Sequence, residues 1–205
     1  MSYQWLEWAR RVQALAQAGL EFTKDEYDRE RYEELWELSM EIMSSYSEYD
    51  MKQLTNLFQD EHGYPTPKMD VRGAVFKDGR ILMVQERMDN KWSLPGGFCE
   101  VGLSPCENIV KEIYEESGYH TIPCKFLALM DMMKHPHPPQ PYHYYKVFIQ
   151  CEIVGGERSS GIETNDVAFF HENALPEISI KRNTKEQIKM LFEFYINPSK
   201  QAIVD

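Results

Sequence analysis

The chain has 205 residues, of which 42% are hydrophobic and 13% aromatic, and this composition supports a folded core. Its formal net charge is −11, which opposes non-specific binding to nucleic acid and to anionic membranes and favours small substrates over polymers. No apolar run is long enough to span a membrane, and the N-terminus lacks a basic leader followed by an apolar stretch, so we expect a cytoplasmic protein.

The first part of the chain shows helical periodicity with no strand pattern. Apolar side chains at helical spacing predict helices over residues 3–18, with Gly19 as the stop, over about 25–46, and after Asp50 through Phe58. Helices of this size bury little surface alone, so we expect them to dock against another domain or a second subunit.

A break in this pattern predicts a domain boundary near residues 59–68. Gly63, Pro65 and Pro67 interrupt the helical spacing there, before alternation typical of strands begins. We therefore divide the chain into a small all-helical N-terminal domain, residues 1–62, and a second domain, residues 63–205. Of the net charge of −11, the first domain carries −8, from fourteen acidic and six basic side chains.

The second domain combines strands with helices. Asp78-Gly79 is a dipeptide typical of two-residue turns, and it joins two apolar runs into a predicted hairpin. Thr184 and Gln187 form a capping box for a late helix. The predicted strands cover 71–77, 80–85, 126–133, 144–154 and 167–171, and the predicted helices begin at Pro105 and at about Lys185, the latter ending at about Ile196.

The helix that begins at Pro105 has strong end signals. Ser104 is a good N-cap, and Glu107 completes a capping box with it. Gly118 supplies the left-handed residue that ends the helix after about thirteen residues. One face is expected to be buried, and its side chains are Cys106, Ile109, Val110 and Ile113.

A second face of this helix clusters carboxylates at Glu112, Glu115 and Glu116. Like charges at these spacings repel, and a hard divalent cation relieves the repulsion. Oxygen ligands suit Mg²⁺ or Mn²⁺, which commonly bridge to substrate phosphates. Gly96 and Gly97 precede the helix and allow the backbone to approach a metal or phosphate closely. The structural alternative is a solvated acidic helix face, which the turn, cap and terminal glycine together disfavour.

The stretch from Leu94-Pro95-Gly96-Gly97 to Lys111-Glu112-Ile113-Tyr114-Glu115-Glu116-Ser117-Gly118 resembles a Nudix box. The resemblance implies an α+β fold, a Nudix α/β/α sandwich with a mixed sheet, and metal ligation by Glu112, Glu115, Glu116 and a carbonyl of the Gly96-Gly97 turn. Two positions depart from the family pattern, because Leu103 replaces the box glutamate and Lys111 the box arginine. We hypothesise that these two departures are coupled, since a carboxylate and a guanidinium lost together leave no unpaired charge.

The N-terminal segments Trp5-Leu6-Glu7-Trp8-Ala9 and Tyr27-Asp28-Arg29-Glu30-Arg31-Tyr32 look like those of a Nudix subgroup acting on nucleoside diphosphates linked to a moiety X. That subgroup includes CDP-choline pyrophosphatases. The resemblance implies Mg²⁺-dependent hydrolysis of NDP-X to nucleoside monophosphate and phospho-X, with CDP-choline as first choice, by a homodimer. The enzymatic alternatives are ADP-ribose, NADH or a UDP-sugar as substrate, or an RNA end. The alternative of another class is a non-catalytic, nucleotide-sensing Nudix module.

Other residues are candidates for the site. Glu163 lies in the region from which relatives bring an additional carboxylate as base or ligand, with loop decoration equally plausible. Arg87 can reach a phosphate, and Trp92 can stack on a base, although simple packing of Trp92 is favoured. The proline-rich loop with His135 and His137 is expected near the site, in contact with X or the base, and metal binding by these histidines is disfavoured.

Two further groups of residues have simpler interpretations. Trp5, Trp8 and Trp36 can form an aromatic cage for a quaternary ammonium, but their helical spacing favours core packing. The cysteines form no Cys-x-x-Cys pair and are expected to be reduced thiols packed as small hydrophobic side chains: Cys99, Cys106, Cys124 and Cys151.

Overall fold

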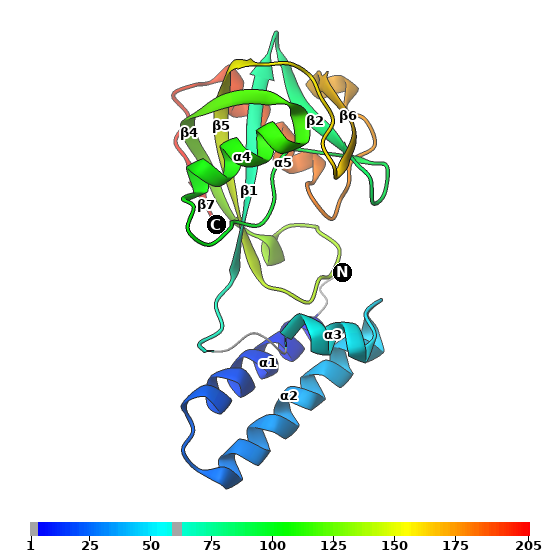
Figure 1. The fold of residues 1–205 in the computed structure, drawn as a ribbon, viewed down its shortest axis with the longest axis vertical. Helices are drawn as coiled ribbons and strands as arrows, with labels where there is room; N and C mark the ends of the chain where they lie inside the picture. The colour runs from blue at the N-terminus through cyan, green and yellow to red at the C-terminus, as the bar shows by residue number, and fades with distance from the viewer. Residues whose placement is uncertain (1–3, 59–62) are drawn as a thin grey trace. The chain divides into compact units, whose positions relative to one another are not determined.

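The computed structural model describes residues 4–58 and 63–205, which form two compact units. The first unit lies within Met1–Pro67 and also includes Pro139–His143, and the second comprises Lys68–Pro138 and Tyr144–Asp205. The first is helical, whereas the second contains a sheet with helices (Figure 1). The predicted division between residues 62 and 63 touches the undescribed segment 59–62 and stays a prediction.

The helical unit contains α1 (Gln4–Phe22), α2 (Glu26–Tyr46) and α3 (Met51–Phe58). The predicted stop at Gly19 is wrong, because α1 continues through it for three more residues. A Cβ on Gly19 would lie 2.5 Å from the Tyr32 ring, so this glycine allows α1 and α2 to approach closely. The predicted start of the first helix at residue 3 lies outside the described residues.

A small apolar core holds the helical unit together, and it includes Leu6, Ala9, Met40, Met43, Leu54 and Phe58. A segment from later in the chain completes this unit. The Tyr142 hydroxyl donates to the Leu57 carbonyl at 3.1 Å, and the Tyr142 ring packs edge-on against Phe58. Arg10 Nε donates to the Pro141 carbonyl at 3.0 Å. Residues 139–143 therefore belong to the fold of the helical unit.

The second unit is built on a mixed sheet. β1 pairs with β5 in parallel and with β2 in an antiparallel hairpin, β4 pairs with β5 antiparallel, and β7 joins the edge of β4 in parallel. β2 also pairs with β3 and β6. The strand bounds are β1 Lys68–Lys77, β2 Arg80–Glu86, β3 Trp92–Ser93, β4 Tyr119–Asp131, β5 Tyr144–Gly156, β6 Thr164–Phe170 and β7 Ile203–Val204.

Both faces of the sheet are covered by helices. Figure 1 shows α4 (Pro105–Ser117) in front of the sheet and α5 (Lys185–Ile196) behind it. Successive side chains of β2 point to opposite faces of the sheet and contribute to the apolar core on each face. Ile81 and Met83 pack on the α5 side, while Leu82 and Val84 pack on the α4 side. The predicted α+β class with helices on a mixed sheet is confirmed.

The predicted ends of α4 and α5 agree with the structure. Ser104 and Glu107 form the capping box of α4, and Gly118 at φ 75° ends it. Thr184 and Gln187 form the corresponding box of α5. The strand predictions were less accurate, since β4 begins at Tyr119 and is followed by the 3₁₀ turn η1 (Met132–Lys134), and the second 3₁₀ turn is η2 (Glu172–Ala174).

Two expectations about small apolar residues need correction. Cys106 and Cys124 are exposed, Cys99 is half-buried, and only Cys151 is buried. The expectation that all four thiols are packed as small hydrophobic side chains is therefore wrong. The exposure of Cys106 also removes it from the predicted buried face of α4, where Ile109 and Ile113 are fully buried. Within residues 4–58 and 63–205, no helix has both the length and the apolar content needed to cross a membrane.

Candidate active site

The turn Leu94–Gly97 brings the backbone against the carboxylates of α4. The Gly96 N–H donates to Glu116 Oε2 at 2.8 Å, and the Glu116 side chain is buried. A Cβ on Gly97 would lie 3.0 Å from Glu112 Oε1, and one on Gly96 would lie 2.0 Å from the Val71 carbonyl oxygen. A side chain at Gly96 would therefore collide with the backbone of β1, whereas one at Gly97 would press only on the flexible end of Glu112.

The electrostatics of this pair favour a bound cation. Burial raises the pKa of Glu116 to about 8, and the charges of Glu112 and Glu86 add to the rise against the lowering effect of Arg72. Burial also raises the pKa of Glu112, with Glu115 and Glu163 contributing in the same direction. Carboxylates whose ionisation is opposed by burial and by neighbouring acidic charges bind a hard divalent cation readily, since its charge compensates theirs.

Glu115 lies at the edge of the cluster and is more exposed. Its carboxylate is 3.7 Å from the Lys111 ammonium, which also contacts Glu100 directly. Lys111 thus has acidic partners although the box glutamate is replaced by Leu103, which lies exposed in the preceding turn. The Glu100 contact shows how the two departures from the Nudix box leave no isolated charge. Their coupling stays a hypothesis, which the variants Leu103→Glu, Lys111→Arg and the double variant test.

The segment with Glu163 is attached to α4. The Thr164 hydroxyl donates to the Glu116 carbonyl at 3.0 Å, and the Glu163 carbonyl accepts from the Arg87 N–H at 3.0 Å. Arg87 Nε also donates to the Thr164 carbonyl at 3.4 Å. The Glu163 carboxylate is exposed, and its charge contributes to the raised pKa of Glu112. The structure therefore brings Glu163 into the electrostatic environment of the α4 carboxylates, with Arg87 as its backbone anchor.

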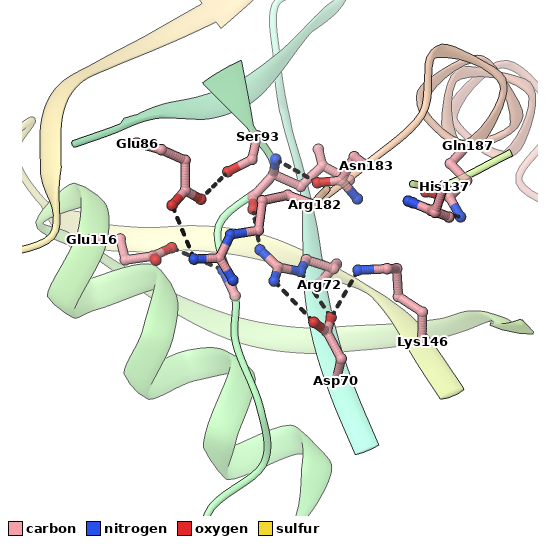
Figure 2. Close-up of polar contacts among 12 residues, drawn as sticks. Asp70, Arg72, Glu86, Ser93, Glu116, His137, Lys146, Arg182, Asn183 and Gln187 are labelled. Carbon is pink, nitrogen blue, oxygen red and sulfur yellow. Dashed lines mark hydrogen bonds and ion pairs between the residues drawn. The ribbon is translucent and has the colours of Figure 1, made fainter. Parts of the chain in front are cut away.

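A buried charge cluster lies beside this turn (Figure 2). Asp70 and Arg72 on β1 form a bidentate ion pair, at 2.8 and 3.0 Å, and Lys146 on β5 contacts the same carboxylate at 3.2 Å. Arg72 Nη1 donates to the Leu94 carbonyl at 3.1 Å, which fixes the start of the Leu94–Gly97 turn. Every guanidinium nitrogen of Arg72 therefore has a protein partner.

Burial shifts the protonation of this cluster. It lowers the pKa of Lys146 to about 7, although Asp70 opposes the shift. Burial also disfavours ionised Asp70, but Arg72 and Lys146 outweigh it and hold the pKa of that carboxyl below its ordinary value. The Asp70–Arg72 pair is thus ionised, while Lys146 can lose its proton near neutral pH.

A second charged group connects the sheet to the segment before α5. The Glu86 carboxylate accepts from the Ser93 hydroxyl at 2.7 Å and lies 3.3 Å from Arg182 Nη2. Asn183 Oδ1 accepts from the Leu94 N–H at 3.0 Å, so residues 182–183 are fixed against the Leu94–Gly97 turn. Figure 2 shows the Arg182 guanidinium directed toward Glu86, on the side of the cluster that holds Glu116.

The two histidines of the proline-rich loop anchor it at two points. His137 Nδ1 lies 2.8 Å from the Ile180 carbonyl, and its Nε2 lies 3.0 Å from Gln187 Nε2. A carbonyl only accepts, so Nδ1 carries the proton and Nε2 accepts from the amide. Burial lowers the pKa of His137 to about 4, which keeps it neutral. His135 Nε2 contacts Asp205 Oδ2 at 2.9 Å.

The tryptophans serve mainly as packing residues. Trp92 packs edge-on against Phe170 at 4.7 Å and joins the apolar core on the α5 side. Trp5 and Trp36 pack against the helical core, whereas Trp8 is exposed. Trp5, Trp36 and Trp92 agree with packing, which was the favoured interpretation, whereas the exposure of Trp8 contradicts it.

The sequence analysis missed five charged residues around this turn. A signal was present, because Asp70, Arg72 and Glu86 interrupt otherwise apolar strands, and Lys146 lies two residues into a strand. Charged side chains are rarely buried unless they are paired, so their positions within buried strands predict a polar cluster. The fifth residue, Arg182, precedes a capping box and carries no comparable signal.

The residues present fit a divalent metal. Glu112, Glu115 and Glu116 offer carboxylate oxygens, and the Gly96-Gly97 backbone packs against Glu112 and Glu116, although the Gly97 carbonyl already accepts from the Val71 N–H at 2.8 Å. No three acidic, histidine or cysteine side chains converge as a finished metal cage in the part of the chain that the structure describes. The fit therefore rests on the chemistry of the donors and on the mutual repulsion of the carboxylates.

Comparison with known proteins identifies the family. Residues 67–194 match the NUDIX domain, and residues 3–58 match the UDP-X-like, N-terminal oligomerisation domain. The chain is a Nudix hydrolase. Enzymes of this family use divalent metal ions, in agreement with the carboxylate cluster on α4. This Nudix hydrolase is a pyrophosphohydrolase.

The similar proteins match most or all of the length of this Nudix hydrolase. A Bacillus subtilis (strain 168) protein named "Putative ADP-ribose pyrophosphatase YjhB" is 61% identical over 202 residues, which cover 98% of this chain and 97% of that protein. A crystal structure of a UDP-X diphosphatase has 36% identity and a TM-score of 0.65, covering 100% of this chain and 99% of that one. An ADP-ribose pyrophosphatase from Streptococcus suis has 38% identity and a TM-score of 0.62, covering 68% of this chain and 100% of that one.

Proposed function

We propose that this Nudix hydrolase cleaves the diphosphate of a nucleoside diphosphate linked to X, in the cytoplasm and with Mg²⁺, to a nucleoside monophosphate and phospho-X. The observation that carries the proposal is the carboxylate pair Glu112 and Glu116 held against the Gly96-Gly97 turn. Buried or half-buried acidic oxygens beside a close-packed glycine turn suit a metal that bridges to phosphate. Mn²⁺ satisfies the same donors.

ADP-ribose is the first substrate to test. The names of the relatives support it, because the 61% identical protein and the Streptococcus suis structure are both named as ADP-ribose pyrophosphatases. The UDP-X diphosphatase structure supports UDP-linked substrates as the next choice. CDP-choline, predicted first from the sequence, stays a candidate together with NADH. The net charge of −11 makes an RNA end the weakest candidate.

In the proposed reaction, water adds across one P–O–P linkage, so that one product leaves with the bridging oxygen and the other gains a hydroxyl. Glu112, Glu115 and Glu116 would hold the metal, and the Gly96 N–H orients Glu116. A bound Mg²⁺ supplies charge stabilisation at the phosphate oxygens. The exposed Glu163 carboxylate accepts a proton from the attacking water, and Arg87 fixes the backbone of its segment.

The test is hydrolysis of a substrate panel with Mg²⁺. Purified protein is incubated with ADP-ribose, UDP-sugars, CDP-choline, NADH and a short RNA, and the products are separated by chromatography. We expect nucleoside monophosphate and phospho-X from one NDP-X. Glu116→Gln should lower turnover by at least about a hundredfold, because it removes a charged ligand while its amide oxygen still accepts from the Gly96 N–H.

The matched control is Glu172→Gln, which neutralises an exposed carboxylate in η2. It should retain the activity of the unchanged protein. Wild-type turnover by Glu116→Gln would contradict the metal assignment. A panel in which no nucleoside monophosphate forms would contradict the proposed substrate class.

A further inference from the structure

Two arginines lie in the polar cluster of Figure 2, and they differ in how their donors are used. Arg72 is fully buried, and its three nitrogens bind Asp70 and the Leu94 carbonyl. Arg182 has a side chain that is 32% exposed, and in the described residues its one recorded partner is Glu86, through Nη2. Arg182 therefore has N–H groups and solvent access with which to bind a ligand, whereas Arg72 has no solvent access.

The position of Arg182 relative to the carboxylates is fixed by three contacts. Asn183, its neighbour in sequence, accepts from the Leu94 N–H at the start of the Leu94–Gly97 turn. Glu86 orients the guanidinium at 3.3 Å and is itself held by Ser93. Arg182 pairs with Glu86, and the charge of Glu86 helps to raise the pKa of Glu116, which is a proposed metal ligand. A partly exposed guanidinium beside this group of carboxylates suits an anion that the metal also binds.

We infer that Arg182 binds the diphosphate of the substrate and that Glu86 is the positioning residue that directs it. The inference rests on the proposed NDP-X substrate and names the residue that binds the phosphate oxygens left free by the metal. Arginine matches phosphate through two parallel N–H donors, and the ion pair with Glu86 leaves one edge of the planar group available.

The experiment measures how Arg182 variants bind ligands with and without a diphosphate. The probes are the α,β-methylene nucleoside diphosphate with the base of the hydrolysed substrate, and the corresponding nucleoside monophosphate. Arg182→Gln should raise the KM for NDP-X and the Ki of the methylene compound by about tenfold to a hundredfold, because a charge-assisted hydrogen bond is lost. The Ki of the monophosphate should change by less than about threefold, since it lacks the second phosphate.

Further variants separate binding from folding. Lys185→Gln removes an equal charge from an exposed position three residues along the chain and should leave KM unchanged. Arg182→Lys keeps the charge and serves if Arg182→Gln does not fold, and it should raise KM about threefold to fivefold, because the two-donor fork is lost. Glu86→Gln should raise KM by a smaller factor than Arg182→Gln, and the double variant should equal Arg182→Gln, since Glu86 acts through the guanidinium.

The outcomes distinguish the two proposals. If the unchanged protein hydrolyses an NDP-X and Arg182→Gln has the same KM and the same Ki for the methylene compound, the role of Arg182 is wrong and the proposed function stands. If both Ki values rise equally, Arg182 does not recognise the diphosphate. If the unchanged protein hydrolyses no NDP-X, the proposed function fails and the inference fails with it.

Discussion

At the scale of single residues, Asp70 is the charge on which the buried cluster depends. Its carboxylate pairs with both Arg72 and Lys146, and all three side chains are almost completely buried. Asp70→Asn would leave Arg72 and Lys146 buried without their shared carboxylate and should lower the free energy of unfolding by about 3 to 5 kcal/mol. Lys146→Met removes one charge and leaves the Asp70–Arg72 pair, so it should be neutral or stabilising. Urea unfolding of both variants measures the difference, and equal destabilisation would contradict this account.

The lowered pKa of Lys146 also predicts a pH dependence of stability. Its pKa is about 7 in the folded protein and near 10.5 in the unfolded chain. Between these values the unfolded chain binds the extra proton at this lysine, so the contribution of Lys146 to the free energy of unfolding should rise as the pH increases from about 7 to about 10, against the opposite contribution that Glu116, with its pKa of about 8, makes below pH 8. Lys146→Met should lack this rise. Urea titrations at pH 6.5 and 9 measure it, and the same increase in both proteins would assign the effect to another group.

At the scale of structural elements, substitutions at the two glycines of the turn before α4 should separate an effect on catalysis from an effect on stability. A Cβ at Gly97 would press on the Glu112 carboxylate, the far end of a flexible side chain, so Gly97→Ala should fold but lower kcat by about tenfold or more. A Cβ at Gly96 would meet the Val71 backbone, and its φ of 136° is strained for alanine, so Gly96→Ala should lower the melting temperature. Gly155→Ala, at an open strand position, is the control for both. Full activity of Gly97→Ala would contradict the close packing of Glu112.

The elements also show what the sequence could predict. Local chemistry determines where α4 and α5 begin, so their capping boxes were visible in the sequence. Gly19 misled the analysis because its role depends on Tyr32 of a neighbouring helix. The short strands β3 and β7 consist of two residues each and exist through pairing, which no periodicity reveals. The carboxylates of α4 could be predicted because they lie close together within one helix. Arg182 meets its neighbours only through the fold and could not.

At the scale of the whole molecule, the helical unit carries an exposed apolar stripe. Trp8, Leu15 and Phe22 recur every seven residues along α1 and are 56%, 67% and 65% exposed. This part of the chain matches an oligomerisation domain, and the stripe is a surface that an oligomer would cover. We predict a homodimer that Leu15→Glu converts to monomer, because a carboxylate would be buried in the interface. Sedimentation velocity measures the state, with Arg11→Gln as a control of equal charge change. A dimeric Leu15→Glu would place the interface elsewhere.

The inclusion of Pro139–His143 in the helical unit has a consequence for how this architecture can be inherited. A gene that joined or lost the helices by one recombination event near residue 67 would leave Tyr142 without Leu57 and Phe58. The helices and the later loop must therefore be exchanged together or change in step. A Nudix relative that lacks the helices should carry a different sequence at this loop. It should not retain an aromatic residue at the position of Tyr142, because the residues that Tyr142 contacts would be absent.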